Sequence, residues 1–107
     1  MADSEQPATA TGRDAVLSDL MRRITLRDQS ALTALYDATS SQVYGLALSI
    51  LRCEADAEEV TLDVFERLWR TASIRFDPAK GSVLALILVM TRNLSIDRRR
   101  AKLARSA

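Results

Sequence analysis

The sequence contains no histidine and one cysteine, Cys53, among its 107 residues. A single cysteine cannot form an internal disulfide, and its solitary use fits a reducing compartment. The same shortage excludes a zinc site of the usual Cys/His kind and catalysis by histidine. Because a free cysteine behaves as a small hydrophobe, we interpret Cys53 as an inert packing residue.

Glycine and proline are scarce, with three and two residues, and aromatic residues make up only 5% of the chain. With so few backbone breakers, long helices are favoured over a turn-rich β fold. Apolar residues form 48% of the sequence, which is enough for one mostly aliphatic core in a single domain. The composition therefore predicts an all-α fold, a compact bundle of about four helices.

Long hydrophobic runs are also absent, since the clearest one, residues 83–90, is far too short to span a bilayer. The N-terminal stretch MADSEQPATATGR has no apolar centre and is not a signal peptide. We therefore expect a cytoplasmic protein without membrane insertion. Residues 1–12 lack periodicity and are predicted to be a disordered lead-in to a helical domain over residues 13–107.

Apolar residues recur with helical spacing in the rest of the chain. The pattern predicts four helices, over residues 13–26, 29–52, 55–73 and 83–104. Asp28, Asp56 and Ser82 are the candidate N-caps of the second, third and fourth helices. The segment SIRFDPAKGS, residues 73–82, contains Asp-Pro and Lys-Gly and is predicted to be a loop.

The last predicted helix changes character along its length. Its first eight residues are apolar on every side, which predicts burial among the other helices. Further along, two sides are expected to differ. One side carries the apolar residues Val83, Ile87, Met90 and Leu94, and the other carries the polar residues Arg92, Ser95, Arg99 and Lys102. The helix is thus expected to leave the core and become a cationic arm.

Charges of opposite sign are segregated in two segments. Residues 54–66 hold six acids and no base, whereas residues 92–105 hold six bases and one acid, Asp97, which we expect to pair with Arg100. This segregation indicates two surfaces with different partners, although solvated helix faces remain the alternative. Leu62 lies among the acids, as an apolar anchor with a charged rim.

The basic segment has residue types that suit single-stranded DNA. A cationic stripe of Arg92, Arg99 and Lys102 could follow a phosphate backbone. Asn93 can donate and accept hydrogen bonds at a base edge. Arg75 and Lys80 could neutralise phosphates at the two ends of the loop, and a glycine there lets backbone amides approach a flipped base.

Three blocks of sequence in this order resemble bacterial sigma factors of the extracytoplasmic-function type. The blocks are ALTALYDATSSQVYGLALSIL (31–51), DAEEVTLDVFERLW (56–69) and RFDPAKGSVLALILVMTRNLSIDRRR (75–100). The resemblance implies region 2 of a sigma factor. Such a domain binds the β′ clamp helices of RNA polymerase core, reads and opens the promoter −10 element in transcription initiation, and is not an enzyme.

The resemblance also implies roles for particular residues. The expected polymerase contacts are Glu58, Glu59, Leu62, Asp63 and Glu66. The expected contacts to the −10 element, mainly to its single non-template strand, come from the loop, Phe76, Asp77, Lys80, Gly81 and Ser82, and from Arg92, Asn93, Asp97, Arg98 and Arg99.

The sequence departs from the family pattern at several positions. The family usually has glutamine at Leu62 and aromatic residues at Val83 and Leu86. Ile87 and Leu88 stand where housekeeping sigma factors have the tryptophan pair that wedges the duplex open. Capture of a flipped base by the loop is therefore the expected route to opening.

Two further expectations complete this interpretation. The resemblance implies an anti-sigma factor as a partner, and no cofactor or metal is expected. A helical protein-interaction module or regulator with a basic tail, which does not act on promoters, remains the alternative function. An enzyme is the weakest option, since the chain lacks a Gly-rich phosphate loop and a convergent set of carboxylates.

Overall fold

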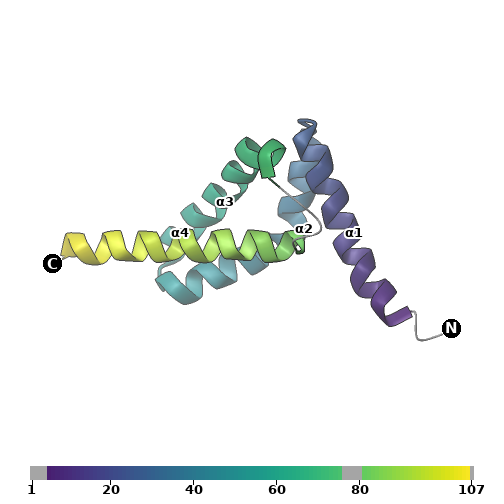
Figure 1. Cartoon of the computed structure of the whole chain (residues 1–107). Coiled ribbons are helices and arrows are strands. Elements are labelled where there is room, and N and C mark those ends of the chain that lie inside the picture. Colours follow the sequence, from purple (N-terminus) through teal and green to yellow (C-terminus); the bar gives the residue numbers. More distant parts are fainter. Residues whose placement is uncertain (1–4, 76–80, 107) are drawn as a thin grey trace.

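A computed structural model describes the backbone of residues 5–75 and 81–106 and the side chains of residues 12–71 and 81–106. These residues form four helices: α1 (Glu5–Thr25), α2 (Gln29–Leu51), α3 (Glu54–Arg75) and α4 (Val83–Ser106). The bundle is elongated, 59 × 32 × 23 Å. The N-terminal part of α1 and the C-terminal part of α4 project at opposite ends (Figure 1). The predicted all-α fold is confirmed.

Helix α1 packs through one apolar stripe. Its buried residues are Leu17, Leu20, Met21 and Ile24, as the spacing predicted. The helix begins at Glu5, eight residues before the predicted start at residue 13. Extending a helix costs less than nucleating one, so a helix held by its packed stripe continues through residues without a strong breaker. Pro7 lies in the first turn, where a missing N–H loses no intrahelical bond. The division of the chain at residue 13 remains a prediction.

Helix α2 is the centre of the bundle and packs against all three other helices. Ala31, Leu35, Val43 and Ala47 of its buried stripe are completely covered. The predicted N-cap is confirmed, because the Asp28 carboxylate accepts hydrogen bonds from the backbone N–H groups of residues 30 and 31. The helix ends where its left-handed C-cap residue, at φ 55°, donates its backbone N–H to a carbonyl one turn back.

Helix α3 begins one residue earlier than predicted, and its predicted cap is wrong. The Ala57 N–H donates to the carbonyl of Cys53 (2.9 Å), so Cys53 stands at the start of the helix. Asp56 is the third residue of α3, and its carboxylate turns to side chains of α4 instead. The predicted stripe is otherwise confirmed over the described side chains, with Val60, Val64 and Leu68 buried.

A loop was predicted over residues 73–82, but α3 continues to Arg75, so the first part of that prediction is wrong. Residues 76–80 lie outside the described part of the chain. Gly81 has φ 136°, a conformation that L side chains rarely adopt, so glycine is required there. Ser82 caps α4 as predicted. Its Oγ accepts the N–H of Ala85 at 3.0 Å, and its carbonyl accepts the N–H of Leu86 at 3.1 Å.

Helix α4 is buried on one side only, which corrects two predictions. Its apolar first half is not enclosed all round, because Ala85 is exposed and Val89 is 56% exposed. The buried stripe instead follows an i, i+4 line, Val83, Ile87, Thr91 and Ser95. Ser95 was expected on the cationic side, but it is completely buried and its Oγ has no hydrogen-bond partner.

Membrane-spanning potential was searched over the described residues. None of the helices there is long and apolar enough to cross a bilayer.

Candidate polymerase and nucleic-acid interfaces

The five expected polymerase contacts lie together on the outer side of α3, and we call them the acidic face. Glu58, Glu59 and Glu66 are exposed, and Asp63 is partly exposed. Leu62 is 62% exposed among them. An exposed leucine surrounded by carboxylates is suited to a partner that offers an apolar pocket with basic residues around it.

A groove between α2 and α3 adjoins the acidic face. Leu62 and Glu58 form part of one wall, and Tyr36 and Tyr44 of α2 are among the residues opposite. The ring of Tyr36 also meets that of Phe65 edge to face, with ring centroids 4.9 Å apart. The groove extends the candidate polymerase surface onto α2.

The two tyrosines were not among the predicted site residues. They recur with the helical spacing of the other apolar residues of α2, and that pattern gave no indication of an interface. In the structure Tyr36 is 37% exposed, and partial burial together with nearby Glu54 and Glu58 raises the pKa of Tyr44. Aromatic side chains with a polar group are common at protein interfaces. Their presence was the feature of the sequence that could have indicated an interface role for the two tyrosines.

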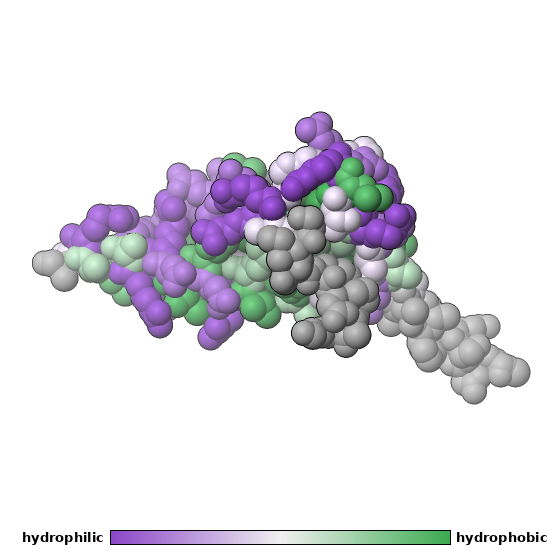
Figure 2. All heavy atoms as spheres, turned by 45° about the horizontal axis from the view of Figure 1, so that its top comes forward, coloured by the Kyte–Doolittle hydropathy of each residue, from purple (hydrophilic) through white to green (hydrophobic). Residues whose placement is uncertain are grey.

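The exposed side of α4 carries most of the expected DNA contacts that lie on this helix. Arg92, Asn93, Asp97 and Arg99 are exposed, and Arg100 joins them. We call Arg92, Asn93, Arg99 and Arg100 the basic face. In Figure 2 hydrophilic atoms gather along the arm that α4 forms, with apolar atoms between them. The described residues include no salt bridge of Asp97, so the expected pair with Arg100 is not formed.

Two cations that were expected to contact DNA are directed toward α3 instead. The Arg98 guanidinium donates to the Asp56 carboxylate from Nε at 3.1 Å and from a terminal nitrogen at 3.0 Å, and it also binds Glu59. The Lys102 ammonium donates to the other Asp56 oxygen at 2.5 Å. Both cations therefore join α4 to the N-terminal part of α3.

Asp56 is the centre of this cluster, which we call the Asp56 clamp: Asp56, Glu59, Arg98 and Lys102. Its side chain is only 12% exposed. Hydrogen bonds from Lys102 and then Arg98 lower the pKa of Asp56 from 3.8 to about 2, against the effect of burial. The hydrogen bond with Asp56 correspondingly raises the pKa of Arg98 and of Lys102. The Asp56 carboxylate therefore links α3 to α4 through charge-assisted hydrogen bonds to two cations.

The loop part of the predicted DNA site is mostly undescribed. Phe76, Asp77 and Lys80 lie outside the described residues, and Arg75 is known only as the backbone end of α3. Gly81 and Ser82 are placed at the start of α4. The end of α3 and the start of α4 thus flank the loop.

Among the described residues no group of three His, Cys, Asp or Glu side chains could hold a metal ion. Glu58 and Glu66 of the acidic face are exposed, whereas Glu59 is bound by Arg98 of α4.

The family model of sigma-70 region 2 matches residues 35–105, which run from within α2 to the end of α4. The chain therefore belongs to the sigma-70 region 2 family. The matched residues include the acidic face, the basic face and the Asp56 clamp.

Curated proteins to which this chain is similar include ECF RNA polymerase sigma factors named SigK. Those of Mycobacterium tuberculosis and Mycobacterium bovis are 42% identical over 97 residues, which cover 88% of this chain and 51% of the relative. The protein of Mycolicibacterium vanbaalenii is 39% identical over 92 residues, or 86% of this chain and 46% of the relative. The predicted resemblance to extracytoplasmic-function sigma factors is confirmed. The chain spans about half the length of these relatives.

Proposed function

We propose that this chain is the promoter-recognition domain of an alternative RNA polymerase sigma factor. It binds the β′ clamp helices of the core enzyme and recognises and opens the promoter −10 element. The observation that carries the proposal is the presence of an acidic face on α3 and a basic face on α4, held together by the Asp56 clamp in a region 2 fold. The domain acts by binding and has no catalytic role.

The acidic face supports the polymerase contact. Its carboxylates attract a basic partner surface over a distance and so speed encounter, while buried apolar area supplies most of the affinity. Leu62, which projects from this face beside the groove of Tyr36 and Tyr44, is the natural anchor. A leucine at this position, in place of the family's usual glutamine, makes the contact more apolar.

The polymerase contact is tested by Leu62→Glu. The variant should weaken binding to an isolated β′ clamp-helix fragment at least tenfold, because it replaces the apolar anchor by a charge of the same sign as its neighbours. Val16→Glu is the matched control, since Val16 is 60% exposed and lies on α1, outside the acidic face. Isothermal titration or a quantitative pull-down measures both. Equal affinities for the two variants would place the polymerase contact elsewhere.

The basic face supports the DNA contact. Arg92 and Arg99 are seven residues apart on one side of α4, about 10 Å along the helix axis. A stacked strand places one phosphate about every 3.4 Å, so this separation corresponds to roughly three nucleotides. Asn93 lies between them in sequence and is exposed, as a residue that reads a base edge must be.

The DNA contact is tested by the salt dependence of binding to a labelled −10 non-template strand. Arg92→Gln should reduce the slope of log K against log salt by about 0.7, the value for one phosphate contact to a single strand. Arg13→Gln is the charge-matched control, because Arg13 is exposed on α1, a different helix from the one that carries the basic face. If both variants shift the slope equally, the arginine of α4 makes no specific phosphate contact.

Exposed apolar residues on α4 favour a second candidate, a helical protein-interaction module. Val89 and Leu103 are 56% and 60% exposed on the same helix as the basic face. Under this alternative the chain binds proteins without polymerase or DNA. Within the first proposal, the same residues and the acidic face form a surface that an anti-sigma factor would cover in the cytoplasm.

Competition between a candidate partner and the β′ fragment for binding to the chain distinguishes the sigma factor domain from the protein-interaction module.

A further inference from the structure

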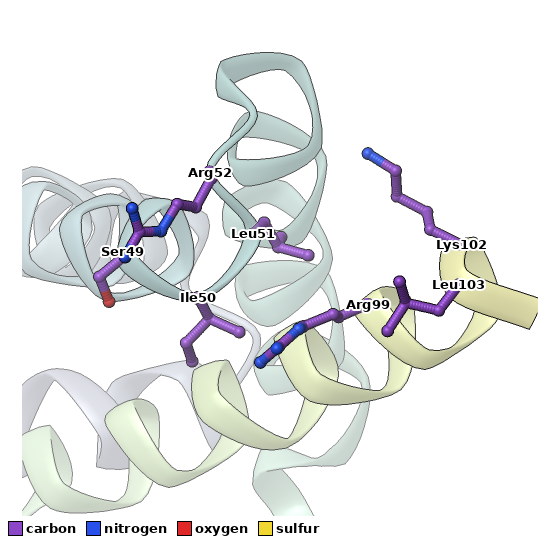
Figure 3. A pocket seen from close by; sticks show the side chains of 7 residues that line it. All are labelled: Ser49, Ile50, Leu51, Arg52, Arg99, Lys102 and Leu103. Atoms are coloured by element: carbon purple, nitrogen blue, oxygen red, sulfur yellow. The ribbon is translucent and has the colours of Figure 1, made fainter. Parts of the chain in front are cut away.

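A hollow lies between the C-terminal end of α2 and the second half of α4. It has a volume of about 510 Å³, which is within the range of small-ligand sites. Its lining residues come from two short segments, Ser49, Ile50, Leu51 and Arg52 of the α2 end and Arg99, Lys102 and Leu103 of α4. Figure 3 shows these side chains around the opening. No motif in the sequence pointed to this place.

The hollow is cationic and contains no acid among its lining residues. Arg52 and Arg99 are both exposed, and they come from different helices. Lys102 contributes less, because its ammonium is held by Asp56 at 2.5 Å. Figure 3 shows Arg99 extending toward Ile50 while Lys102 points in a different direction. Figure 3 shows the Arg52 side chain extending toward Ser49. Both arginines line the hollow, and each guanidinium can bind a phosphate with paired N–H donors.

Apolar side chains form the rest of the hollow. Ile50 and Leu51 of the α2 end are partly buried, and Leu103 of α4 is 60% exposed. A free inorganic phosphate gains nothing from such walls. A nucleotide does, because its sugar and base faces bury apolar area when they lie against aliphatic side chains.

The hollow continues the basic face of α4. Arg99 belongs to both, and Arg92 lies about 10 Å before it along the helix axis. A strand that follows the basic face from Arg92 therefore reaches the hollow after roughly three nucleotides. Arg52 stands on the far side, as the left-handed residue that ends α2 at φ 55°. Glycine is the usual residue in that conformation, so the arginine is a costly choice there.

We propose that this hollow binds one nucleotide of the promoter strand. Its phosphate lies between the guanidinium groups of Arg52 and Arg99, and its sugar and base lie against Ile50 and Leu103. Arg52 is thereby a DNA-binding residue on α2, outside the loop and helix that carry the other contacts. The inference rests on the proposed function, because it requires a strand bound along α4.

A methylphosphonate scan tests the proposal. Each phosphate of a −10 oligonucleotide is replaced in turn by an uncharged methylphosphonate, and its binding to the whole chain is measured by fluorescence anisotropy at low salt. The wild-type chain should lose roughly tenfold in affinity at one linkage near the upstream or downstream end of its footprint. Arg52→Gln should lose about the same factor with the natural strand and should be insensitive to replacement at that linkage.

Two further variants make the result specific. Arg13→Gln, with the same change of charge on α1, should keep the sensitivity of the wild-type chain at every linkage. Leu103→Ser should weaken single-strand binding by roughly threefold while leaving the pattern of linkages unchanged, because it removes only the apolar wall. Circular dichroism confirms that each variant keeps its helices.

The outcomes separate the two proposals. If the wild-type chain binds the strand and Arg52→Gln shows the same pattern of linkages, the nucleotide site is wrong and the proposed function stands. The hollow would then be available to an acidic segment of another protein, and Arg52→Gln would weaken the binding of that segment. If the wild-type chain binds no strand at any salt concentration, both proposals are overturned.

Discussion

The side chain of Asp56 connects two helices, α3 and α4. Its carboxylate is only 12% exposed and accepts hydrogen bonds from Arg98 and Lys102, which are one turn apart on α4. A lone carboxylate this well covered would be unfavourable, but two cations compensate it. Removal of Asp56 would leave Lys102 without its acceptor and Arg98 with Glu59 alone.

The depressed pKa of Asp56 predicts a loss of stability in acid. Its pKa falls from 3.8 to about 2 on folding, so between these values the unfolded chain binds more protons than the folded one. The stabilisation is therefore complete above about pH 4 and is lost as the pH falls toward 2. Urea unfolding at a series of pH values should show the free energy of unfolding decreasing over this range.

Asp56→Asn isolates this contribution. The variant should be less stable than the wild-type chain at pH 7 and should approach it in stability near pH 2, since the asparagine cannot titrate. Asp37→Asn, an exposed position on α2, is the control for loss of one negative charge. A constant difference between the wild-type chain and Asp56→Asn at all pH values would contradict the role of the clamp.

The same residue marks a limit of prediction from sequence. Asp56 was assigned as a cap because it precedes an apolar stripe, and a cap is a local pattern. Its actual partners are 42 and 46 residues away in sequence. Local spacing placed Arg98 and Lys102 correctly on one helix, but only the crossing of α3 and α4 shows that they bind an acid.

The starts of α2 and α4 were predicted well from the sequence. A serine or aspartate at an N-cap accepts N–H groups only two or three residues away, so the pattern is contained in a few letters. Asp28 and Ser82 both cap as predicted. The start of α1 was missed because residues 5–12 have neither a cap nor an apolar stripe to indicate a helix.

The N-cap of α4 is predicted to contribute to the stability of the domain. Ser82→Ala removes the acceptor for the Ala85 N–H, which should lower the free energy of unfolding by about 1 kcal/mol. Ser82→Asp should keep most of the stability, because aspartate caps equally well and also favours the positive end of the helix dipole. Thermal unfolding followed by circular dichroism compares them. Equal melting temperatures for the alanine variant and the wild-type chain would show that the cap contributes nothing.

The burial of α4 was over-predicted for a reason that applies to small bundles in general. Eight apolar residues in a row predicted a helix surrounded by others. With only three neighbours in the described chain, all on one side of it, α4 can bury one stripe, so Ala85 and Val89 remain at the surface. The apolar run correctly predicted that α4 contributes to the core. The number of helices that could cover it, however, cannot be known from the local sequence.

At the scale of the whole molecule, stability depends on the residues of α2 that face all three neighbours. Leu35 is completely buried, whereas Leu62 of α3 is 62% exposed. Leu35→Ala should lower the free energy of unfolding by about 3 kcal/mol, through lost burial and a cavity. Leu62→Ala, the same chemical change at the surface, should alter it by less than about 0.5 kcal/mol.

This pair of variants also separates folding from function. Leu62→Ala should weaken the β′ contact although the fold is intact, and Leu35→Ala should leave that contact unchanged below its melting temperature. Chemical denaturation and binding to the clamp-helix fragment supply the two measurements. If Leu62→Ala unfolds the chain as much as Leu35→Ala, the leucine of the acidic face is a core residue and the assignment of that face is wrong.

The distribution of charge is likewise a property of the whole molecule. The net charge is only +1, yet the acids of α3 and the bases of α4 form separate faces. The sequence predicted this separation because each helix carries its charges in one segment. The aromatic groove, the Asp56 clamp and the hollow beside Arg52 could not be predicted, since each is made by two helices whose relative placement depends on the packed core.

The burial of Val83 and Ile87 has a consequence during synthesis. These residues close a core whose other members lie in α1, α2 and α3. On the ribosome, α3 is complete at residue 75, but the buried stripe of α4 is complete only at Ser95, 20 residues later. At a synthesis rate of about 5–20 residues per second, the apolar surface of the first three helices therefore stays exposed for roughly 1–4 s. Helix α4, the last of the four to emerge, therefore covers the apolar surface of the first three and completes the core. The same helix carries the basic face.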